Sequence, residues 1–516
     1  MARVSSISTW PALPFVALAL ACAPAPADLV VINGGDAALL DPQLGSSMPE
    51  ARIAGALHAG LTRLDPVTLM PVPDLAASWT TDPSARVWVF ILRPDLRWSD
   101  GSPLGLADWL ASWERLRAPA TGAPYASWLA EAQIRGERLP DGRDVLQVSF
   151  PSARPMFGEM AASWPLAPVH ASLRAAAPGT LPSLLPTSGP YRLVSRRVRD
   201  RVRVERNPYY WKTEPNSAGV IDFLAVESQF TALNLFLAGE ADFVPNVPRL
   251  AVPRLLAEHA AAFRPSPQFA SIFLRLNLRH PLLQNQELRL ALAQSLDRQA
   301  LAAMIGGGRA ASASLVPPLL SDFHSAPSPA GEDLAAARAH LARAREQIGT
   351  LGIPVEDALA GLELLVSSTE QNRDLAAALR EQWRTRLGLT LRIQALEGRE
   401  ARAAERAGEY ALARGSWVGD YLDPETFLSP FRAGDPGNRT GFDDPAYEAL
   451  LAAAAAAANP ATRLELLARA ETLLLATVAV IPLLTDANQE LVCPTLRGFT
   501  PNPRGYVDWS ALRRQP

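Results

Sequence analysis

The clearest shortage in the sequence is of lysine. Lys212 is the single lysine among 516 residues, although lysine and arginine together number 49. Schiff-base chemistry and a phosphate-binding loop with an essential lysine are therefore nearly excluded. A ligand carboxylate would have to be bound by arginine, side-chain amides or backbone N–H groups. The net charge of -3 gives no bulk attraction for nucleic acid or anionic lipid.

Metal-binding and catalytic motifs are also missing. The six histidines lie far apart in the sequence, and no HExxH pattern occurs. The sequence contains neither a GxSxG nucleophile elbow nor the surroundings of a catalytic cysteine. The "GGGR" at 306–309 lacks the following lysine of a nucleotide loop, so it indicates a flexible turn. We therefore expect no metal, no cofactor and no enzymatic activity.

Long apolar segments are absent as well, since no run approaches the about 20 residues of a membrane-spanning helix. Residues 1–22 resemble an export signal, with Arg3 followed by a short apolar stretch and small residues. "LALAC" at 18–22 resembles a bacterial lipobox, which predicts lipidation of Cys22; plain cleavage nearby is the alternative. Either way the mature protein is expected outside the cytoplasm. Cys493 then has no partner and is expected to be a small buried hydrophobe.

The length and composition describe a soluble globular protein of two or three compact units, with 48% hydrophobic and 20% charged residues. The stretch 190–211 is rich in arginine, but valines alternate with the arginines and acidic residues interrupt them. It therefore predicts a hairpin with a solvated face and not a nucleic-acid patch. The alanine run at 452–458 predicts a helix, and a second helix is expected after Asn459 and Pro460.

Residues 362–421 alternate between strand and helix patterns. A buried strand is followed by an amphipathic helix with Thr369 near its N-cap and Gly388 as its C-cap. A second strand, a short helix and a third strand complete the pattern. The alternation predicts a parallel α/β sheet, whose ligands would bind at the carboxyl ends of the strands. Asp420 lies at that end of the third strand.

Asp420 raises a question of charge, because the segment around it, "RGSWVGDYLDP" at 414–424, otherwise resembles a buried strand. An unpaired carboxylate in such a place would cost several kcal/mol. Asp420 therefore needs a partner, which is either another side chain of the protein or a ligand.

The sequence resembles the oligopeptide-binding proteins of bacterial ABC importers, within the extracellular solute-binding proteins of family 5, the peptide and nickel type. The resemblance covers roughly residues 29–510. It is carried by eleven fragments in the family's order: "LDPQLG", "GLTRLDP", "LAASW", "VFILRPDLRWSDGSPL", "PYASWL", "SGPYRL", "ERNPYYW", "FLRLN", "LRLALAQSLDR", "GDYLDPETFL" and "LRGFTPNPRGY". "PYASWL" and "ARGSWVGDYLDP" favour the oligopeptide branch over the nickel and heme branches.

The resemblance implies an α/β fold with two lobes, the periplasmic-binding-protein fold of type II, cluster C, with an extra inserted domain. One lobe combines a discontinuous domain with the inserted domain, the other lobe is a single α/β unit, and two chain crossings form a hinge. The expected ranges are 29–58, 184–278 and 485–516 for the discontinuous domain, 59–183 for the inserted domain, and 279–484 for the second lobe. The implied function is that of a monomeric receptor that captures short peptides and delivers them to ABC permease subunits.

The resemblance also implies how a peptide would be bound. Asp420 matches the family aspartate that takes the α-ammonium group of the peptide. Backbone groups around Ser416 and Val418 would pair with the extended peptide by strand addition. Arg414 matches a family residue that receives the peptide carboxylate, with an internal ion pair as its alternative role.

Four further residues are expected at the site. Tyr125 would contribute from the opposite lobe and Trp417 would line a side-chain pocket, with plain packing as the alternative for both. Met48 and Asn372 complete the expected ligand-binding set.

Some positions depart from the family pattern. Asn372 stands where relatives carry a histidine, Glu405 stands in place of an arginine, and a lysine used near the "GGGR" turn is missing, with Arg309 close by. The preferred peptide length is therefore left open. A cell-wall peptide, a nickel chelate or heme are the alternative ligands, and an exported hydrolase is the alternative from another functional class.

Overall fold

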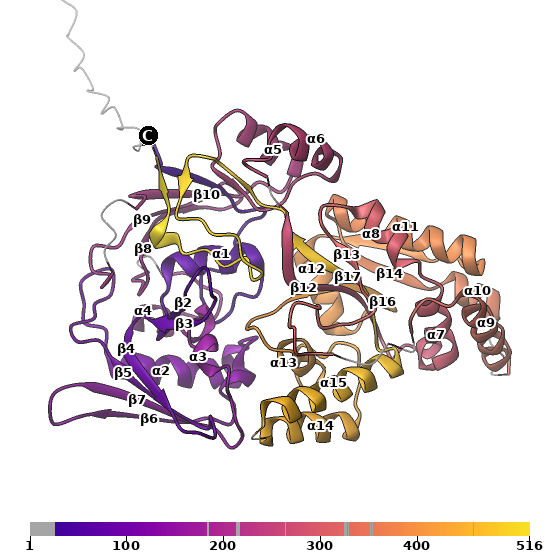
Figure 1. The fold of residues 1–516 in the computed structure, drawn as a ribbon, viewed down its shortest axis with the longest axis horizontal. Helices are drawn as coiled ribbons and strands as arrows, with labels where there is room; N and C mark the ends of the chain where they lie inside the picture. The colour runs from indigo at the N-terminus through magenta and orange to yellow at the C-terminus, as the bar shows by residue number, and fades with distance from the viewer. Residues whose placement is uncertain are drawn as a thin grey trace, which may run out of the picture.

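The protein forms two lobes that lie side by side and are joined by two strands, β12 (Ser266–Leu276) and β17 (Val480–Asn488) (Figure 1). The computed structural model describes residues 26–182, 185–212, 217–263, 265–324, 328, 330–350, 352, 354–457 and 459–515. The expected signal segment with Cys22 falls outside the described residues. Of the helices that are described, none is long and apolar enough to cross a membrane.

The first lobe contains a six-stranded sheet in the order β18-β11-β1-β10-β9-β8. β1 runs parallel to β10 and β11, and the other pairs are antiparallel. The strands are β1 (Leu29–Ile32), β8 (Tyr191–Arg197), β9 (Arg201–Arg206), β10 (Val220–Leu224), β11 (Phe243–Val244) and β18 (Leu491–Val492). The helices of this part are α1 (Met48–Leu57), α5 (Gln229–Leu237) and α6 (Val252–Glu258), and β19 (Leu496–Arg497) pairs with β20 (Arg513–Arg514).

The arginine-rich stretch of this lobe is an antiparallel hairpin of β8 and β9, as predicted. Most of its arginines pair with carboxylates of the protein. Arg203 binds Asp222 of β10 at 2.7 Å, and Arg192 binds Glu205 at 2.5 Å. The basic composition of the stretch is therefore balanced within the sheet.

A four-stranded antiparallel sheet in the order β4-β5-β7-β6 completes the first lobe. Aromatic residues form its core, since Phe90, Trp109, Trp113 and Phe157 are fully buried. Its strands are β4 (Ala76–Thr81), β5 (Val87–Leu92), β6 (Gln133–Arg138) and β7 (Asp144–Ser149), next to the small pair β2 (Thr62–Leu64) and β3 (Pro71–Pro73). Its helices are α2 (Leu106–Arg117), α3 (Phe157–Met160) and α4 (Ala171–Arg174).

The second lobe is built on a six-stranded sheet in the order β13-β17-β12-β16-β14-β15. The remaining strands are β13 (Ala310–Ala311), β14 (Glu363–Ser367), β15 (Arg392–Leu396) and β16 (Leu412–Val418). β14 is parallel to β15 and to β16, which confirms the parallel pattern predicted for residues 362–421. The whole sheet is mixed, because β12, β13 and β17 join it in antiparallel pairs.

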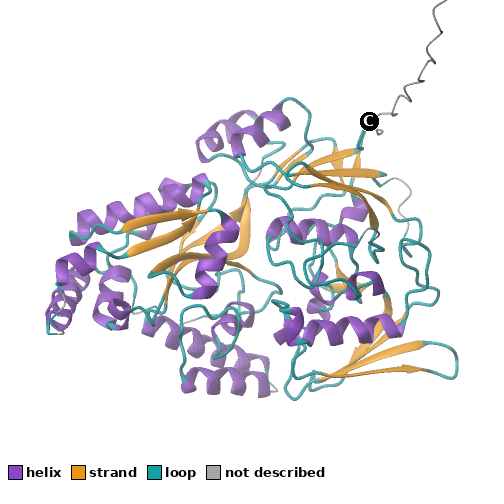
Figure 2. Cartoon of the chain, turned by 180° about the vertical axis from the view of Figure 1, so that it is seen from behind, coloured by secondary structure: helices purple, strands orange, loops and turns teal. Residues whose placement is uncertain are grey.

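Helices lie on both sides of this second sheet (Figure 2). They are α7 (Gln286–Gln294), α8 (Arg298–Ile305), α9 (Leu334–Gly349), α10 (Val355–Ala360), α11 (Glu370–Leu387), α12 (Gly398–Ala407), α13 (Glu425–Leu428), α14 (Pro445–Ala456) and α15 (Pro460–Thr477). The Thr369 side chain caps α11, and Gly388 ends it in a left-handed conformation with φ of 72°, as predicted. The side chain of Asn459 caps α15.

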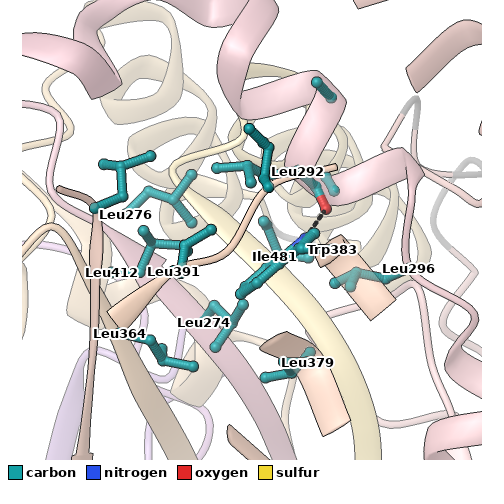
Figure 3. Close-up of a cluster of buried hydrophobic side chains, with 14 of the residues drawn as sticks. Leu274, Leu276, Leu292, Leu296, Leu364, Leu379, Trp383, Leu391, Leu412 and Ile481 are labelled. Carbon is teal, nitrogen blue, oxygen red and sulfur yellow. Dashed lines mark hydrogen bonds between the residues drawn. The ribbon is translucent and has the colours of Figure 1, made fainter. Parts of the chain in front are cut away.

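The largest apolar core packs α7, α8, α9 and α11 against one face of the second sheet. Trp383 of α11 is fully buried in it among leucines of β12, β14 and β16 (Figure 3). Its indole N–H donates to the backbone oxygen of Leu292 at 3.0 Å, so the buried polar group is satisfied. This rigid core fixes the position of β16, which carries the candidate site.

The lobes are connected where β12 and β17 leave the first lobe as an antiparallel pair. Phe263 bridges to Leu491, and the ladder between the two strands then starts at the pair Ser266 and Asn488. The expected discontinuous domain extends to residue 278, whereas β12 pairs with the second sheet along its whole length. The division of the chain into domains stays a prediction.

Candidate functional site

The candidate site begins at an open edge of β16. β16 pairs with β12 along its whole length, but it pairs with β14 only at Leu412 and Ala413. Within the part of the chain that the structure describes, residues 414–418 therefore have no strand on their second edge. Backbone groups on such an edge can pair with the main chain of an extended ligand.

Asp420 follows this open edge and is half-buried. Its backbone N–H donates to Thr426 Oγ1 at 3.0 Å, and the same hydroxyl lies 3.4 Å from Asp420 Oδ2. Among the described residues the carboxylate has no salt bridge. Burial raises the pKa of Asp420 to about 7, and the nearby charge of Arg504 opposes this rise. Such a carboxylate is suited to bind a cation.

Arg504 and Glu159 bring two further parts of the chain to Asp420. The Arg504 guanidinium donates to the backbone oxygen of Asp420, and its Nη1 lies 3.8 Å from Glu159 Oε2. The same Glu159 oxygen accepts the N–H of Leu422 at 3.1 Å. Burial lowers the pKa of Arg504 and raises that of Glu159. No role was expected for either residue from the sequence, although Arg504 lies in the family fragment "LRGFTPNPRGY".

Tyr125 belongs to the first lobe, where it lies in the segment between α2 and β6. Its side chain reaches the site in the second lobe. It lies close enough to the Asp420 carboxylate to lower the pKa of that carboxyl. The ring also packs against Trp128 and Trp164, with centroids 4.8 and 5.6 Å away. The packing that was weighed for Tyr125 is therefore present in the structure, and its contribution to ligand binding stays a prediction.

Arg414 lies near the start of β16 and is half-buried. Its Nη1 donates to Ser416 Oγ at 2.9 Å, and burial lowers the pKa of the guanidinium to about 10. Asp486 is the main opposing charge, but it is already bound by Arg309 at 2.7 Å. Among the described residues Arg414 has no salt bridge of its own, which leaves it able to bind a carboxylate.

Trp417 and Val418 are both half-buried at the end of β16. The Trp417 indole N–H donates to Thr426 Oγ1 at 3.4 Å, and its ring packs against the apolar core under α13, α14 and α15. Val418 pairs with Ala270 of β12. The packing role that was weighed for Trp417 is therefore present in the structure.

Met48 and Asn372 lie at the first turns of two helices, α1 and α11. Met48 begins α1 and is 42% exposed. Asn372 is buried in the first turn of α11, where its amide donates to Ser367 Oγ at 2.6 Å. An amide held in this way supports the end of β14. The roles of Met48 and Asn372 in ligand binding stay predictions.

Glu405, which departs from the family pattern, is neutralised inside the second lobe. It lies 3.2 Å from the Arg275 guanidinium and 2.8 Å from that of Arg439. Arg275 in turn crosses over Gly415, where a Cβ would lie 2.6 Å from its Nη1. A carboxylate at this position therefore balances two arginines beside β16.

We expect Thr426→Val to weaken ligand binding about fivefold, because the Asp420 N–H would lose its acceptor and the carboxylate would lose its orientation. Titration calorimetry on the purified protein measures this change. Thr462→Ala, at an exposed position in the first turn of α15, is the matched control and should bind like the parent. Equal affinities of Thr426→Val and the parent would contradict the prediction.

Comparisons with known proteins agree with this geometry. The sequence profile described as "Bacterial extracellular solute-binding proteins, family 5 Middle" matches residues 70–439. The murein peptide-binding protein MppA of Escherichia coli is 28% identical, over 92% of this chain and 90% of its own. The oligopeptide-binding protein OppA of Salmonella typhimurium is 27% identical, over 92% of this chain and 89% of its own.

Solved structures also bear on the arrangement of the lobes. One structure of the Escherichia coli murein tripeptide-binding protein MppA superposes with a TM-score of 0.86 at 26% identity, covering 94% of this chain and 98% of that chain. The unliganded open form of MppA gives 0.65 at the same identity, covering 94% and 97%. The lobes here are thus arranged differently from that open form. With a profile match over more than half of its length, the chain belongs to family 5 of the bacterial extracellular solute-binding proteins.

Proposed function

We propose that this protein is a receptor that captures short peptides outside the cytoplasm and delivers them to an ABC permease. One observation carries the proposal: the open edge of β16, at residues 414–418, ends at a half-buried carboxylate with no salt bridge among the described residues. An extended peptide with a free amino terminus matches both features. The names of the relatives support the same class of ligand.

The binding mechanism follows from this arrangement. The α-ammonium group of the peptide pairs with the Asp420 carboxylate. It takes the place of the proton on the protonated form and neutralises the charge of the ionised form. The peptide backbone pairs with the edge of β16, and Arg414 attracts the terminal carboxylate. Main-chain hydrogen bonds do not depend on side-chain identity, so affinity can be high while sequence preference stays low.

The length of the peptide depends on the distance between its two terminal partners. Six residues of regular strand separate Arg414 from Asp420 by about 20 Å, whereas a tripeptide spans about 10 Å. The long arginine side chain shortens this gap for a short peptide. Peptides of three to five residues therefore fit the proposal.

The relatives named above are described as periplasmic, and we place this protein in the same compartment. A lipid on Cys22 would hold it at the membrane. We propose that it acts as a monomer and without enzymatic activity. Incubation of the pure protein with tri-alanine should return the peptide intact, and its cleavage would point to a hydrolase.

Peptides derived from the cell wall are the second candidate ligands, because one relative is named for murein peptide. Mass spectrometry of the molecules that co-purify and are released by mild unfolding distinguishes them from ordinary peptides by mass. A nickel chelate or a heme in this fraction, with no peptide, would overturn the proposal.

We expect Arg414→Gln to lower the affinity for tri-alanine about 30-fold, because the carboxylate loses a charged hydrogen-bond partner. Tri-alanine amide, which lacks the carboxylate, should bind the variant and the parent almost equally. Calorimetry with both peptides measures the difference. Equal losses for both peptides would assign Arg414 a structural role.

A further inference from the structure

Tyr421, the residue next to Asp420, connects the two lobes. It belongs to the second lobe, yet it is buried in the aromatic core of the first, with 5% of its surface exposed. Among the described residues of that core, Tyr421 alone comes from outside residues 59–211. Its ring meets Trp128 edge-on, with centroids 6.3 Å apart. The side chain therefore fills a space that the first lobe provides.

The residues that follow Tyr421 also contact the first lobe. Leu422 donates its N–H to Glu159 Oε2 at 3.1 Å, and Glu425 accepts from Arg154 Nη1 at 3.3 Å. We call residues 420–425 the interlobe segment. Each of these contacts joins an atom of one lobe to an atom of the other, so the contacts break when the lobes separate.

The interlobe segment is held firmly by its own lobe. Arg463 of α15 binds both oxygens of Asp423, at 2.5 and 2.9 Å, and also binds Glu425 at 2.7 Å. Thr426 holds the backbone of Asp420. The segment is therefore fixed at both ends before it meets the first lobe, and little conformational entropy is lost when it docks.

We propose that Tyr421 is the positioning residue that couples peptide capture at Asp420 to the closure of the lobes. The inference rests on the proposed function, because Asp420 is the peptide anchor in both. Adjacent residues of one fixed segment carry the anchor and the buried ring, so they enter the first lobe together. The peptide ammonium offsets the cost of burying the Asp420 carboxylate, and burial of the Tyr421 ring then keeps the lobes closed.

This role predicts a specific kinetic effect. A peptide meets the open protein, so its association rate does not depend on the contact between Tyr421 and Trp128. Dissociation requires the lobes to open, which breaks that contact. Loss of the ring should therefore raise the dissociation rate and leave the association rate nearly unchanged.

The test compares the parent with Tyr421→Ala and Tyr421→Phe in stopped-flow or surface-plasmon measurements with tri-alanine. Tyr421→Ala is expected to raise the dissociation rate about 30-fold and to change the association rate less than about threefold. Tyr421→Phe keeps the ring and should stay within about twofold of the parent. Phe230→Ala removes an exposed ring of α5 and is the matched control, expected to bind like the parent.

The outcomes separate this inference from the proposed function. If the parent binds tri-alanine and Tyr421→Ala keeps the parent's dissociation rate, or lowers only the association rate, the coupling role is wrong while peptide binding stands. If the parent does not bind tri-alanine or tetra-alanine, the proposed function fails and the coupling role fails with it. Small-angle scattering adds a second readout. Saturating peptide should contract the parent more than Tyr421→Ala, and equal contraction would contradict the proposal.

Discussion

Asp420→Ala is expected to weaken the binding of peptides with a free amino terminus by about 3 kcal/mol, roughly 150-fold. The physical reason is that a peptide ammonium bound at this site would find no opposing charge at position 420. Titration calorimetry with tri-alanine measures the loss. Asp420→Asn keeps the size of the side chain and removes its charge, so it should lose nearly as much.

The matched ligand control is N-acetylated tri-alanine, which has no ammonium group. It should bind the parent poorly, and Asp420→Ala should discriminate far less between the two peptides. If the parent bound both peptides equally, Asp420 would not be the anchor. The melting temperature of the ligand-free variant provides a further check. It should not fall, because the substitution removes a half-buried charge that has no salt bridge among the described residues.

Acidic pH should also weaken peptide binding strongly. Burial raises the pKa of Asp420 to about 7, so the carboxylate of the free protein takes up a proton as the pH falls below that value. The peptide ammonium needs the ionised form, and at pH 5 only about 1% of the groups are ionised, which lowers the affinity about 100-fold.

The loss of affinity at acidic pH distinguishes titration of Asp420 from titration of the peptide, which would weaken binding at alkaline pH. The α-amino group of a peptide has a pKa of about 8, so it stays charged through the whole acidic range. Calorimetry at pH 6 in buffers of different ionisation enthalpy should detect proton release on binding. Asp420→Asn should lose most of the pH dependence. A constant affinity of the parent between pH 5 and pH 7.5 would contradict the prediction.

The local pattern of the second lobe could be predicted from the sequence because its signals are short-range. The cap at Thr369 and the glycine at 388 act within one turn of α11, and the strand and helix patterns of residues 362–421 follow their own periods. The joining of β12 to β16 could not be predicted in this way. It pairs residues more than 130 positions apart, and nothing in either strand encodes its neighbour.

The residues of the candidate site also differ in whether a short-range sequence signal reveals them. Asp420 could be identified because a carboxylate in an apolar strand is costly in itself, whatever its surroundings. Arg504 and Glu159 could not, because the bond from Arg504 to Asp420 spans 84 positions and that from Leu422 to Glu159 spans 263. Such contacts form only when the two lobes close, and no short-range pattern in the sequence indicates them. Asn372 was expected at the site from the family resemblance; its amide donates to Ser367 Oγ, and its role in ligand binding stays a prediction.

The bare edge of β16 also has a bearing on solubility. An exposed row of unpaired backbone groups invites other chains to add strands and so to aggregate, and proteins commonly avoid this with charges, prolines or bulges. Here the edge ends at Asp420, next to residues that contact the first lobe, and we expect these surroundings to hinder a strand that belongs to a folded neighbour. A free peptide of a few residues meets no such barrier. We therefore expect the neighbouring lobe to protect the edge from other copies of the protein and to favour short peptides as ligands.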